Sequence, residues 1–276
     1  MEALRQVDAW PVDNAAVAVV RQDGARETRG DGTRSFEWAS VTKLATALAV
    51  LVAAEEGIVE LDEQAGPQGS TIRHLLAHAS GLPLDAGAPI AAPGTRRIYS
   101  NAGYEQLADL VAACAEMPFG EYLAAAVLRP LGLGAELAGS PASGVRGTVE
   151  DLALLAAPLV TGQPAIVAPE TLEEATTVAF PGLVGVLPGF GRMEPNDWGL
   201  GFELRDEKQP HWTGRGNSPR TFGHFGQSGS FLWVDPEAQV ACVCLADRDF
   251  GDWAKDAWPR LADAVLDEVR PTGARS

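Results

Sequence analysis

The sequence predicts an α/β (α+β) fold in which strands from both ends of the chain form one antiparallel sheet. β-rich runs lie near the N-terminus, at residues 15–24, and near the C-terminus, at 199–205, 229–236 and 239–247. Between them the apolar periodicity is that of helices. Strands at both ends with helices between them indicate one sheet, flanking helices and an inserted, mainly helical domain.

The N-terminal elements follow from local patterns. The apolar run 15–24 ends in Asp23-Gly24, a turn signal, so it is predicted as a strand. A second short strand is expected around residues 34–38. Residues 40–57 are apolar nearly all round and end at Gly57, which predicts a buried helix with a glycine stop.

The middle of the chain, residues 58–195, is expected to be mainly helical. Thr148 and Asp151 form the pattern of a capping box, which marks the start of one helix. The Gly- and Pro-rich residues 180–196 predict an irregular loop. The expected helices are 70–81, 101–116, 119–132 and 147–160.

The C-terminal part returns to strands. Residues 235–238 are expected to form the turn between the last two strands, and 250–269 form an amphipathic helix. The prediction is therefore a discontinuous sheet domain, 1–57 and 196–276, with the helical insertion 58–195. The cleft between the two parts is the expected site.

Composition excludes several classes of partner. The chain has 276 residues and a formal net charge of -16, which repels nucleic acid and anionic membrane surfaces. The longest apolar stretch, 44–54, is too short to span a bilayer, and MEALRQVDAW does not resemble a signal peptide. The chain has three cysteines, Cys114, Cys242 and Cys244. An odd number argues against a disulfide framework, so we expect buried thiols and a cytoplasmic protein.

A first candidate motif, Ser40-Val41-Thr42-Lys43, begins the buried helix. Three residues apart on a helix, the Ser40 and Lys43 side chains share one face. A serine hydroxyl needs a base, and a desolvated lysine amine can serve as one. The other basic residues are almost all arginine; only Lys43, Lys208 and Lys255 are lysines. Alone, this short pattern is weak and favours a structural role.

Two further motifs are also ambiguous in isolation. In Tyr99-Ser100-Asn101, the tyrosine can relay protons and the asparagine can orient an amine, but in isolation a helix N-cap at Asn101 is the favoured interpretation. In His224-Phe225-Gly226, the histidine can face a ligand from an edge strand, although a lone histidine is more often structural.

Together and in this order, Ser-x-x-Lys, Tyr-x-Asn and His-x-Gly resemble the signature motifs of the serine β-lactamase and penicillin-binding-protein superfamily. The Tyr-x-Asn form is similar to the class C β-lactamase branch, with its related esterases and D-amino-acid peptidases. IRHLLAHASGLP and SFLWVDPE also resemble stretches of that branch. The resemblance extends from about Trp38 to Glu237 and implies the β-lactamase/transpeptidase-like fold.

The resemblance implies a role for each motif residue. Ser40 would be acylated by the substrate carbonyl, while Lys43 and Tyr99 would share the general-base and general-acid work. Asn101 would contact the substrate and order Lys43. The backbone N–H groups of Ser40 and Gln227 would form the oxyanion hole.

The third motif departs from that of class C β-lactamases, in which a lysine stands at the position of His224. His224 would line the acyl pocket beside Tyr99, and Gly226 completes the motif. A neutral imidazole lacks the fixed positive charge that faces a β-lactam carboxylate. Phe225 also replaces a small hydroxyl residue. Esterases and peptidases of the branch commonly carry the histidine.

The sequence thus predicts a serine hydrolase with an acyl-Ser40 intermediate, most consistent with an esterase. The substrate would be a small ester or amide, without a cofactor. Alternatives are a β-lactamase, a D-amino-acid peptidase, a β-lactam-binding protein that does not turn over, and an inactive scaffold. The oligomeric state stays open.

Histidines 74 and 78 have the four-residue spacing of some metal ligands on a helix. No glutamate follows His74, and the chain has only two other histidines. We therefore expect no metal site, and expect these side chains to pack beneath the Ser40 helix.

Overall fold

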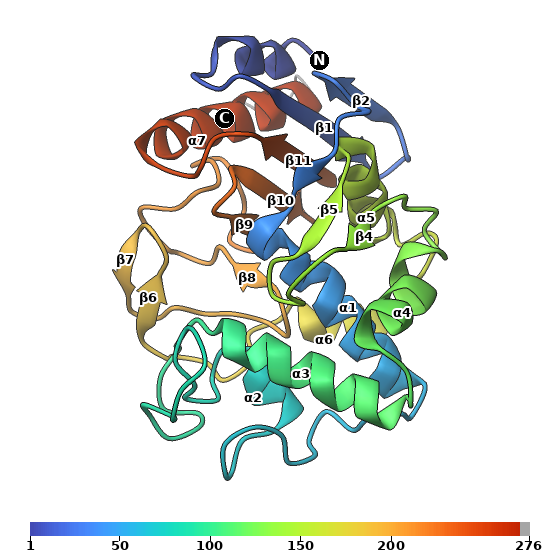
Figure 1. The fold of residues 1–276 in the computed structure, drawn as a ribbon. Coiled ribbons are helices and arrows are strands. Elements are labelled where there is room, and N and C mark those ends of the chain that lie inside the picture. The colour runs from blue at the N-terminus through green and yellow to red at the C-terminus, as the bar shows by residue number, and fades with distance from the viewer. Residues whose placement is uncertain (271–276) are drawn as a thin grey trace.

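The computed structural model describes residues 1–270 and contains one six-stranded sheet in the order β2-β1-β11-β10-β9-β8. Neighbouring strands pair antiparallel, so strands from the two ends of the chain lie side by side (Figure 1). The predicted fold class is therefore confirmed. The strands are β1 Ala15–Arg21, β2 Arg26–Arg29, β8 Glu203–Leu204, β9 Phe222–Gly226, β10 Ser230–Asp235 and β11 Val240–Ala246.

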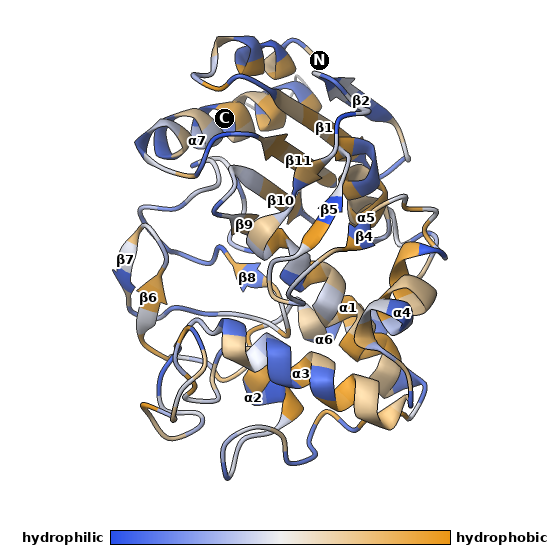
Figure 2. Cartoon of the chain, in the orientation of Figure 1, coloured by the Kyte–Doolittle hydropathy of each residue, from blue (hydrophilic) through white to orange (hydrophobic). Residues whose placement is uncertain are grey.

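The central strands are apolar throughout because both faces of the sheet are covered. In β1, Ala16 and Ala18 belong to one core cluster, whereas Val17 and Val19 belong to another. This alternation is the two-residue period of a strand with a core on each side. The strands are accordingly coloured as apolar in Figure 2. Helices α5 Val149–Thr161 and α1 Thr42–Glu55 share the first core, and α7 Asp252–Val269 shares the second.

Helix α1 lies at the centre of the molecule and extends from the sheet into the helical half (Figure 1). Its residues from Thr42 to Ala53 are all buried, as the apolar sequence predicted. It follows the short 3₁₀ turn η2, Ala39–Val41. The remaining helical elements are η1 Ala3–Ala9, α2 Ile72–Leu76, α3 Asn101–Cys114, α4 Phe119–Leu123, η3 Ala124–Leu128 and α6 Pro169–Ala175.

The middle of the chain contains more strands than its sequence predicted. Strand β3, Phe36–Glu37, pairs with β5, Val145–Gly147, which also pairs with β4, Glu136–Leu137. A hairpin of β6, Gly185–Leu187, and β7, Gly191–Met193, lies where an irregular loop was expected. These strands have two or three residues, too few for a periodic pattern to be visible in the sequence.

Two predicted elements are shorter than expected. Helix α2 ends before His78, whose positive φ of 55° is incompatible with a continuing right-handed helix. The run 199–205 keeps only β8 as a strand, because Gly201 has a φ of 96°.

Helix α5 lies within the range predicted as the insertion, yet it packs against β1 and β11 of the sheet. Its predicted capping box is present. Thr148 Oγ1 accepts the Asp151 N–H at 3.1 Å, and Asp151 Oδ2 accepts the Thr148 N–H at 2.8 Å. The division into 1–57 with 196–276 and 58–195 stays a prediction, and the position of α5 shows that the two parts share a core.

The cysteines differ in their surroundings. Cys242 and Cys244 are free, buried thiols, and burial raises the pKa of each. The prediction of burial was wrong for Cys114, which is exposed at the last position of α3. Its neighbours are apolar, but the helix turns this position to solvent.

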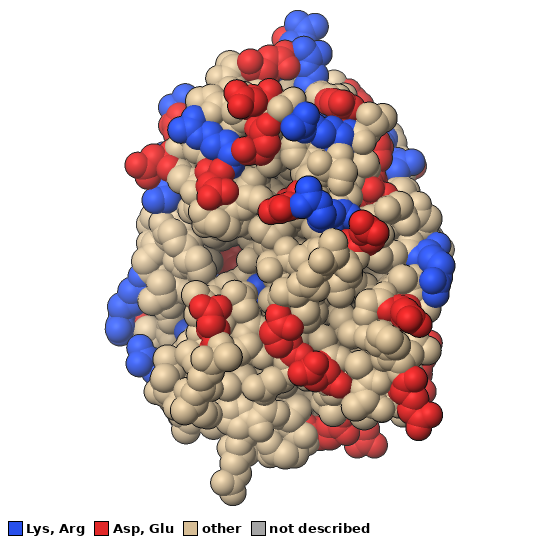
Figure 3. Space-filling model, in the orientation of Figure 1, with Lys and Arg blue, Asp and Glu red and all other residues tan. Residues whose placement is uncertain are grey.

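The surface shows how the net negative charge is distributed. Acidic side chains are scattered over the visible face and do not gather into one patch (Figure 3). Within residues 1–270 no single helix is long and apolar enough to cross a bilayer. Helix α3 and the helical segment 119–128 reach that length and apolarity together, but they meet at an angle of 84°.

Candidate active site

Ser40 lies in a tight turn that is fixed from two sides. Ala39, just before it, has a φ of 44°, which is unfavourable for a residue with a side chain. The backbone of Trp38 holds this turn: its N–H donates to Val145 O at 2.9 Å, and its carbonyl accepts the Ser230 hydroxyl at 2.7 Å. Strained backbone that its surroundings maintain is common at functional sites.

Gly226 allows strand β9 to approach this turn. A Cβ at position 226 would lie 2.3 Å from Ser230 Oγ and 2.7 Å from Trp38 O, both far inside contact distance. Only glycine therefore fits between the third motif and the turn that carries Ser40. The role of Gly226 is to let the backbone of β9 come close to the turn that carries Ser40.

Lys43 lies one helical turn beyond Ser40 and is fully buried. Its Nζ donates to Asn101 Oδ1 and to Ala142 O, each at 2.8 Å. It also lies 4.8 Å from the centre of the Tyr99 ring. These partners carry no negative charge, and burial lowers the pKa of Lys43 to about 7. A substantial fraction of the amine is thus neutral near pH 7, as its apolar helix predicted.

Tyr99 connects the nucleophile to the third motif. It shares a side-chain hydrogen bond with Ser40, and its hydroxyl lies 3.5 Å from His224 Nε2. Burial raises the pKa of Tyr99 well above its usual value, more than the Ser40 hydrogen bond lowers it. The phenol therefore stays protonated and is suited to donate a proton.

His224 is neutral in this environment. Its Nδ1 lies 2.7 Å from Phe225 O, and a carbonyl only accepts, so Nδ1 carries the proton. The lone pair of Nε2 then faces Tyr99. Burial lowers the pKa of His224 to about 3, and the nearby charge of Lys43 contributes. His224 consequently supplies no positive charge.

The two histidines considered as metal ligands have separate structural roles. His78 is buried, accepts the Ser100 N–H at 3.1 Å, and packs against Tyr99 and Trp198. It thereby positions the second motif. His74 accepts the N–H of Thr71 at the start of α2. Within the described part of the chain, no three His, Cys, Asp or Glu side chains are grouped as a metal site.

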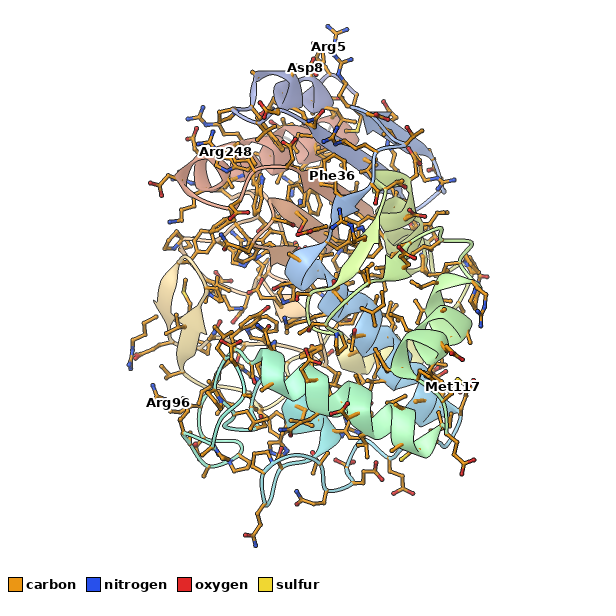
Figure 4. All side chains as sticks on the ribbon, in the orientation of Figure 1. Arg5, Asp8, Phe36, Arg96, Met117 and Arg248 are labelled. Carbon is orange, nitrogen blue, oxygen red and sulfur yellow. The ribbon has the colours of Figure 1, made fainter. Side chains whose placement is uncertain are left out.

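Arg97 positions the segment that precedes Tyr99. Its buried guanidinium donates to carbonyl oxygens of Ala77, Ala179, Phe180 and Asn196, at 2.5 to 3.0 Å. Arg96, its neighbour, extends from the surface (Figure 4). One arginine thus attaches the loop of the second motif to the 179–196 segment.

These elements enclose a pocket of about 260 Å³ beside Ser40. Most of the predicted site residues line it, while Lys43 lies behind it and Gly226 supports it from the turn. Sequence reasoning missed the apolar part of its wall, because those residues come from three separate segments. The lining residues are Ser40, Leu84, Tyr99, Asn101, Leu187, Pro188, Trp198, Glu203, His224, Phe225 and Gln227.

The profile of the Beta-lactamase family matches residues 11–135 and 133–266, which is most of the chain. The chain belongs to the Beta-lactamase family. The resemblance inferred from the three motifs is therefore confirmed.

Solved structures agree with this membership. A β-lactamase from Mycobacterium bovis is 54% identical, with a TM-score of 0.94, covering 97% of this chain and 99% of that one. The simvastatin synthase of Aspergillus terreus shares the fold at 16% identity, with a TM-score of 0.79 and 97% of each chain covered. EstCE1, a hydrolase with promiscuous acyltransferase activity, is 18% identical, with a TM-score of 0.76 and 96% of each chain covered.

A curated relative matches over a shorter range. Penicillin-binding protein 4* of Bacillus subtilis (strain 168) is 28% identical over 131 residues. The match covers 36% of this chain and 29% of that protein. The matched segment therefore spans under a third of the length of that relative.

This Beta-lactamase family protein also places a buried carboxylate, Glu203, in the pocket wall. Glu203 is paired with Lys208 and accepts from His211 Nε2 and Trp212 Nε1, each at 2.9 Å. Burial raises the pKa of Glu203, but Lys208 and His211 together lower it by more. The pKa of Glu203 therefore lies well below its usual range. Trp212 is itself buried against this carboxylate.

Proposed function

We propose that this chain is a serine hydrolase that forms an acyl-Ser40 intermediate with small, neutral esters. The observation that carries the proposal is the wall of the pocket beside Ser40. It is largely apolar, and the third motif presents a neutral His224 where a cation would be needed to bind an anionic substrate.

The chemistry follows from the protonation states. Neutral Lys43 removes the proton of Ser40 as its Oγ bonds to the ester carbonyl carbon. The N–H groups of Ser40 and Gln227 stabilise the negative charge on the carbonyl oxygen. As the ester C–O bond breaks, Tyr99 donates its proton to the departing alcohol, since its raised pKa keeps it protonated. Lys43 then returns the proton it holds to Tyr99.

Substrate class follows from charge. A β-lactam carries a carboxylate, and a charge-assisted hydrogen bond to it contributes roughly 1.5–3 kcal/mol. Without that bond the pocket binds the β-lactam transition state about 10- to 100-fold less well. A neutral ester has no such group and loses nothing. Because His224 has a pKa of about 3, lowering the pH to 6 does not restore the cation.

A second candidate function is that of a β-lactamase. The observation in its favour is the 54% identity to the Mycobacterium bovis β-lactamase. A D-amino-acid peptidase is the corresponding amide alternative. All three candidates use Ser40, and they differ in the charge and the leaving group of the substrate.

The test compares kcat/KM for p-nitrophenyl acetate and a chromogenic cephalosporin at pH 6 and pH 8. The ester should be the better substrate at both values. His224→Lys should raise cephalosporin turnover relative to the ester by about 10- to 100-fold. If the native chain prefers the cephalosporin at both pH values, it is a β-lactamase and the esterase proposal is wrong.

Covalent labelling tests the nucleophile separately. A fluorophosphonate probe should add to Ser40, and Ser40→Ala should abolish both labelling and turnover. Ser228→Ala is the matched control, because Ser228 is another partly exposed serine whose hydroxyl donates to Glu37 O. An adduct on any other residue of the folded protein would contradict the assignment.

A further inference from the structure

A second cavity lies between the loop 205–215 and helix α7, on residues that the proposed chemistry does not use. It encloses about 780 Å³. Most of the side chains in its wall are polar or charged, in contrast to the pocket beside Ser40. The wall is formed by Arg205, Lys208, Gln209, Pro210, His211, Thr213, Gly214, Arg215, Lys255, Asp256, Pro259, Arg260 and Asp263.

The cationic side chains of this wall outnumber its carboxylates. Asp256 is already paired with Arg260, at 2.7 Å. Asp263 Oδ1 accepts the backbone N–H of Gly216 at 2.8 Å. Lys208 is paired with Glu203 behind the wall. Positive charge therefore remains in the cavity, although the chain as a whole has a net charge of -16.

Three basic side chains supply this remaining charge. Arg215 is exposed, and within residues 1–270 no ion pair engages it. Lys255 has an exposed carboxylate, Asp252, at 3.4 Å. Arg205 is the third, and it is buried.

Arg205 gives the strongest indication of a ligand. Its side chain is 7% exposed, and among the described residues no carboxylate pairs with it. Its guanidinium donates only to backbone carbonyls, of Asp206 at 3.0 Å and of Gly214 at 3.4 Å. Its Nη2 group has no partner there. A buried guanidinium without a counter-charge is unfavourable, and a bound oxyanion would provide that charge.

The cavity is held open by the packing of its loop. A Cβ at Gly214 would lie 2.3 Å from Asp263 Oδ1, so the loop is in close contact with α7 at that point. The N–H of Gly214 donates to Asn217 Oδ1 at 2.8 Å. These contacts fix the loop, so the basic side chains face a formed cavity.

We infer that this cavity binds an oxyanion of the phosphate class, held by Arg205, Arg215 and Lys255. A phosphate offers several acceptor oxygens to the fork of a guanidinium. The volume also accommodates an organic group attached to the phosphate. The site is separate from the proposed ester hydrolysis, so either can fail without the other.

The test is calorimetric titration of the full chain with inorganic phosphate and, separately, with phenyl phosphate, at an ionic strength held constant with sodium chloride. We expect saturable binding. Equal affinities would show that the phosphate group suffices, and tighter binding of phenyl phosphate would show that the organic group is also recognised. Either result supports the site.

The matched variants are Arg215→Glu and Arg129→Glu. Both replace an exposed arginine, but Arg129 follows η3 and does not line the cavity. Arg215→Glu should weaken binding about tenfold or more, since it removes a charge-assisted contact and adds repulsion. Arg129→Glu should change nothing. The inference is overturned if binding is no stronger than that of chloride, or if both variants behave alike.

Discussion

The substitution Lys43→Arg tests whether Lys43 acts as a base or only fills space in the core. Arginine keeps its proton at any working pH, so it cannot accept the proton of Ser40. General-base assistance contributes ~10²–10⁴-fold to a rate, and Lys43→Arg should lose that factor on p-nitrophenyl acetate. Lys43→Met, which is similar in length but has no amine, should lose as much.

The size of the effect on stability follows from burial. The pKa of Lys43 falls from 10.5 to about 7 on folding, which corresponds to a preference for the neutral amine of about 5 kcal/mol. Between these two pH values the unfolded chain holds a proton that the folded chain has released. The free energy of unfolding therefore rises with pH across this window, and falls as the pH drops toward 7.

Two measurements check this reasoning. Urea unfolding at pH 7 and pH 9 should show that the wild type gains about 2 kcal/mol more than Lys43→Met over this interval. The kcat/KM of the wild type should rise with pH, with an apparent pKa near 7. A Lys43→Arg variant with near-wild-type turnover, or equal pH dependence of unfolding in the wild type and Lys43→Met, would refute the assignment.

Two further substitutions have defined outcomes. Asn101→Asp places a carboxylate beside Lys43 Nζ, which should raise the pKa of Lys43. The rising limb of the pH–rate profile should then move to higher pH by about one unit or more. If the profile does not move, Lys43 does not determine that limb. Gly226→Ala places a Cβ 2.3 Å from Ser230 Oγ, so the turn must shift, and displacement by about 1 Å can lower the rate about 10²-fold. Gly120→Ala is the control, because its nearest neighbour would be Leu137 Cδ2 at 3.8 Å; equal losses of activity in both glycine variants would contradict the close-approach argument.

The motif residues were predictable because each motif is local. Ser40 and Lys43 share a helical face. Tyr99 and Asn101 lie at the start of a helix. That these pairs meet each other and His224 was not visible in any local pattern. It came from the resemblance to a family, and the structure brings them to one pocket.

Other parts of the site depend on contacts between distant segments. The carbonyl of Ala142, which accepts from Lys43, is separated from it by 99 residues. Glu203 lies in an edge strand of two residues, and its partners Lys208 and His211 come from irregular backbone. No periodicity marks such residues. The early end of α2, before His78, was equally hidden, because a positive φ at a residue other than glycine has no simple sequence signal.

The central position of α1 determines how the two halves of the protein respond to stress. One continuous core contains Ala16 and Val243 of the sheet, Leu48 of α1, and Leu107 and Tyr122 of the helical half. Neither half can unfold without exposing the core of the other, so calorimetry should record a single cooperative transition. The turn that carries Ser40 leads directly into α1, so activity should be lost at the same temperature as the folded structure.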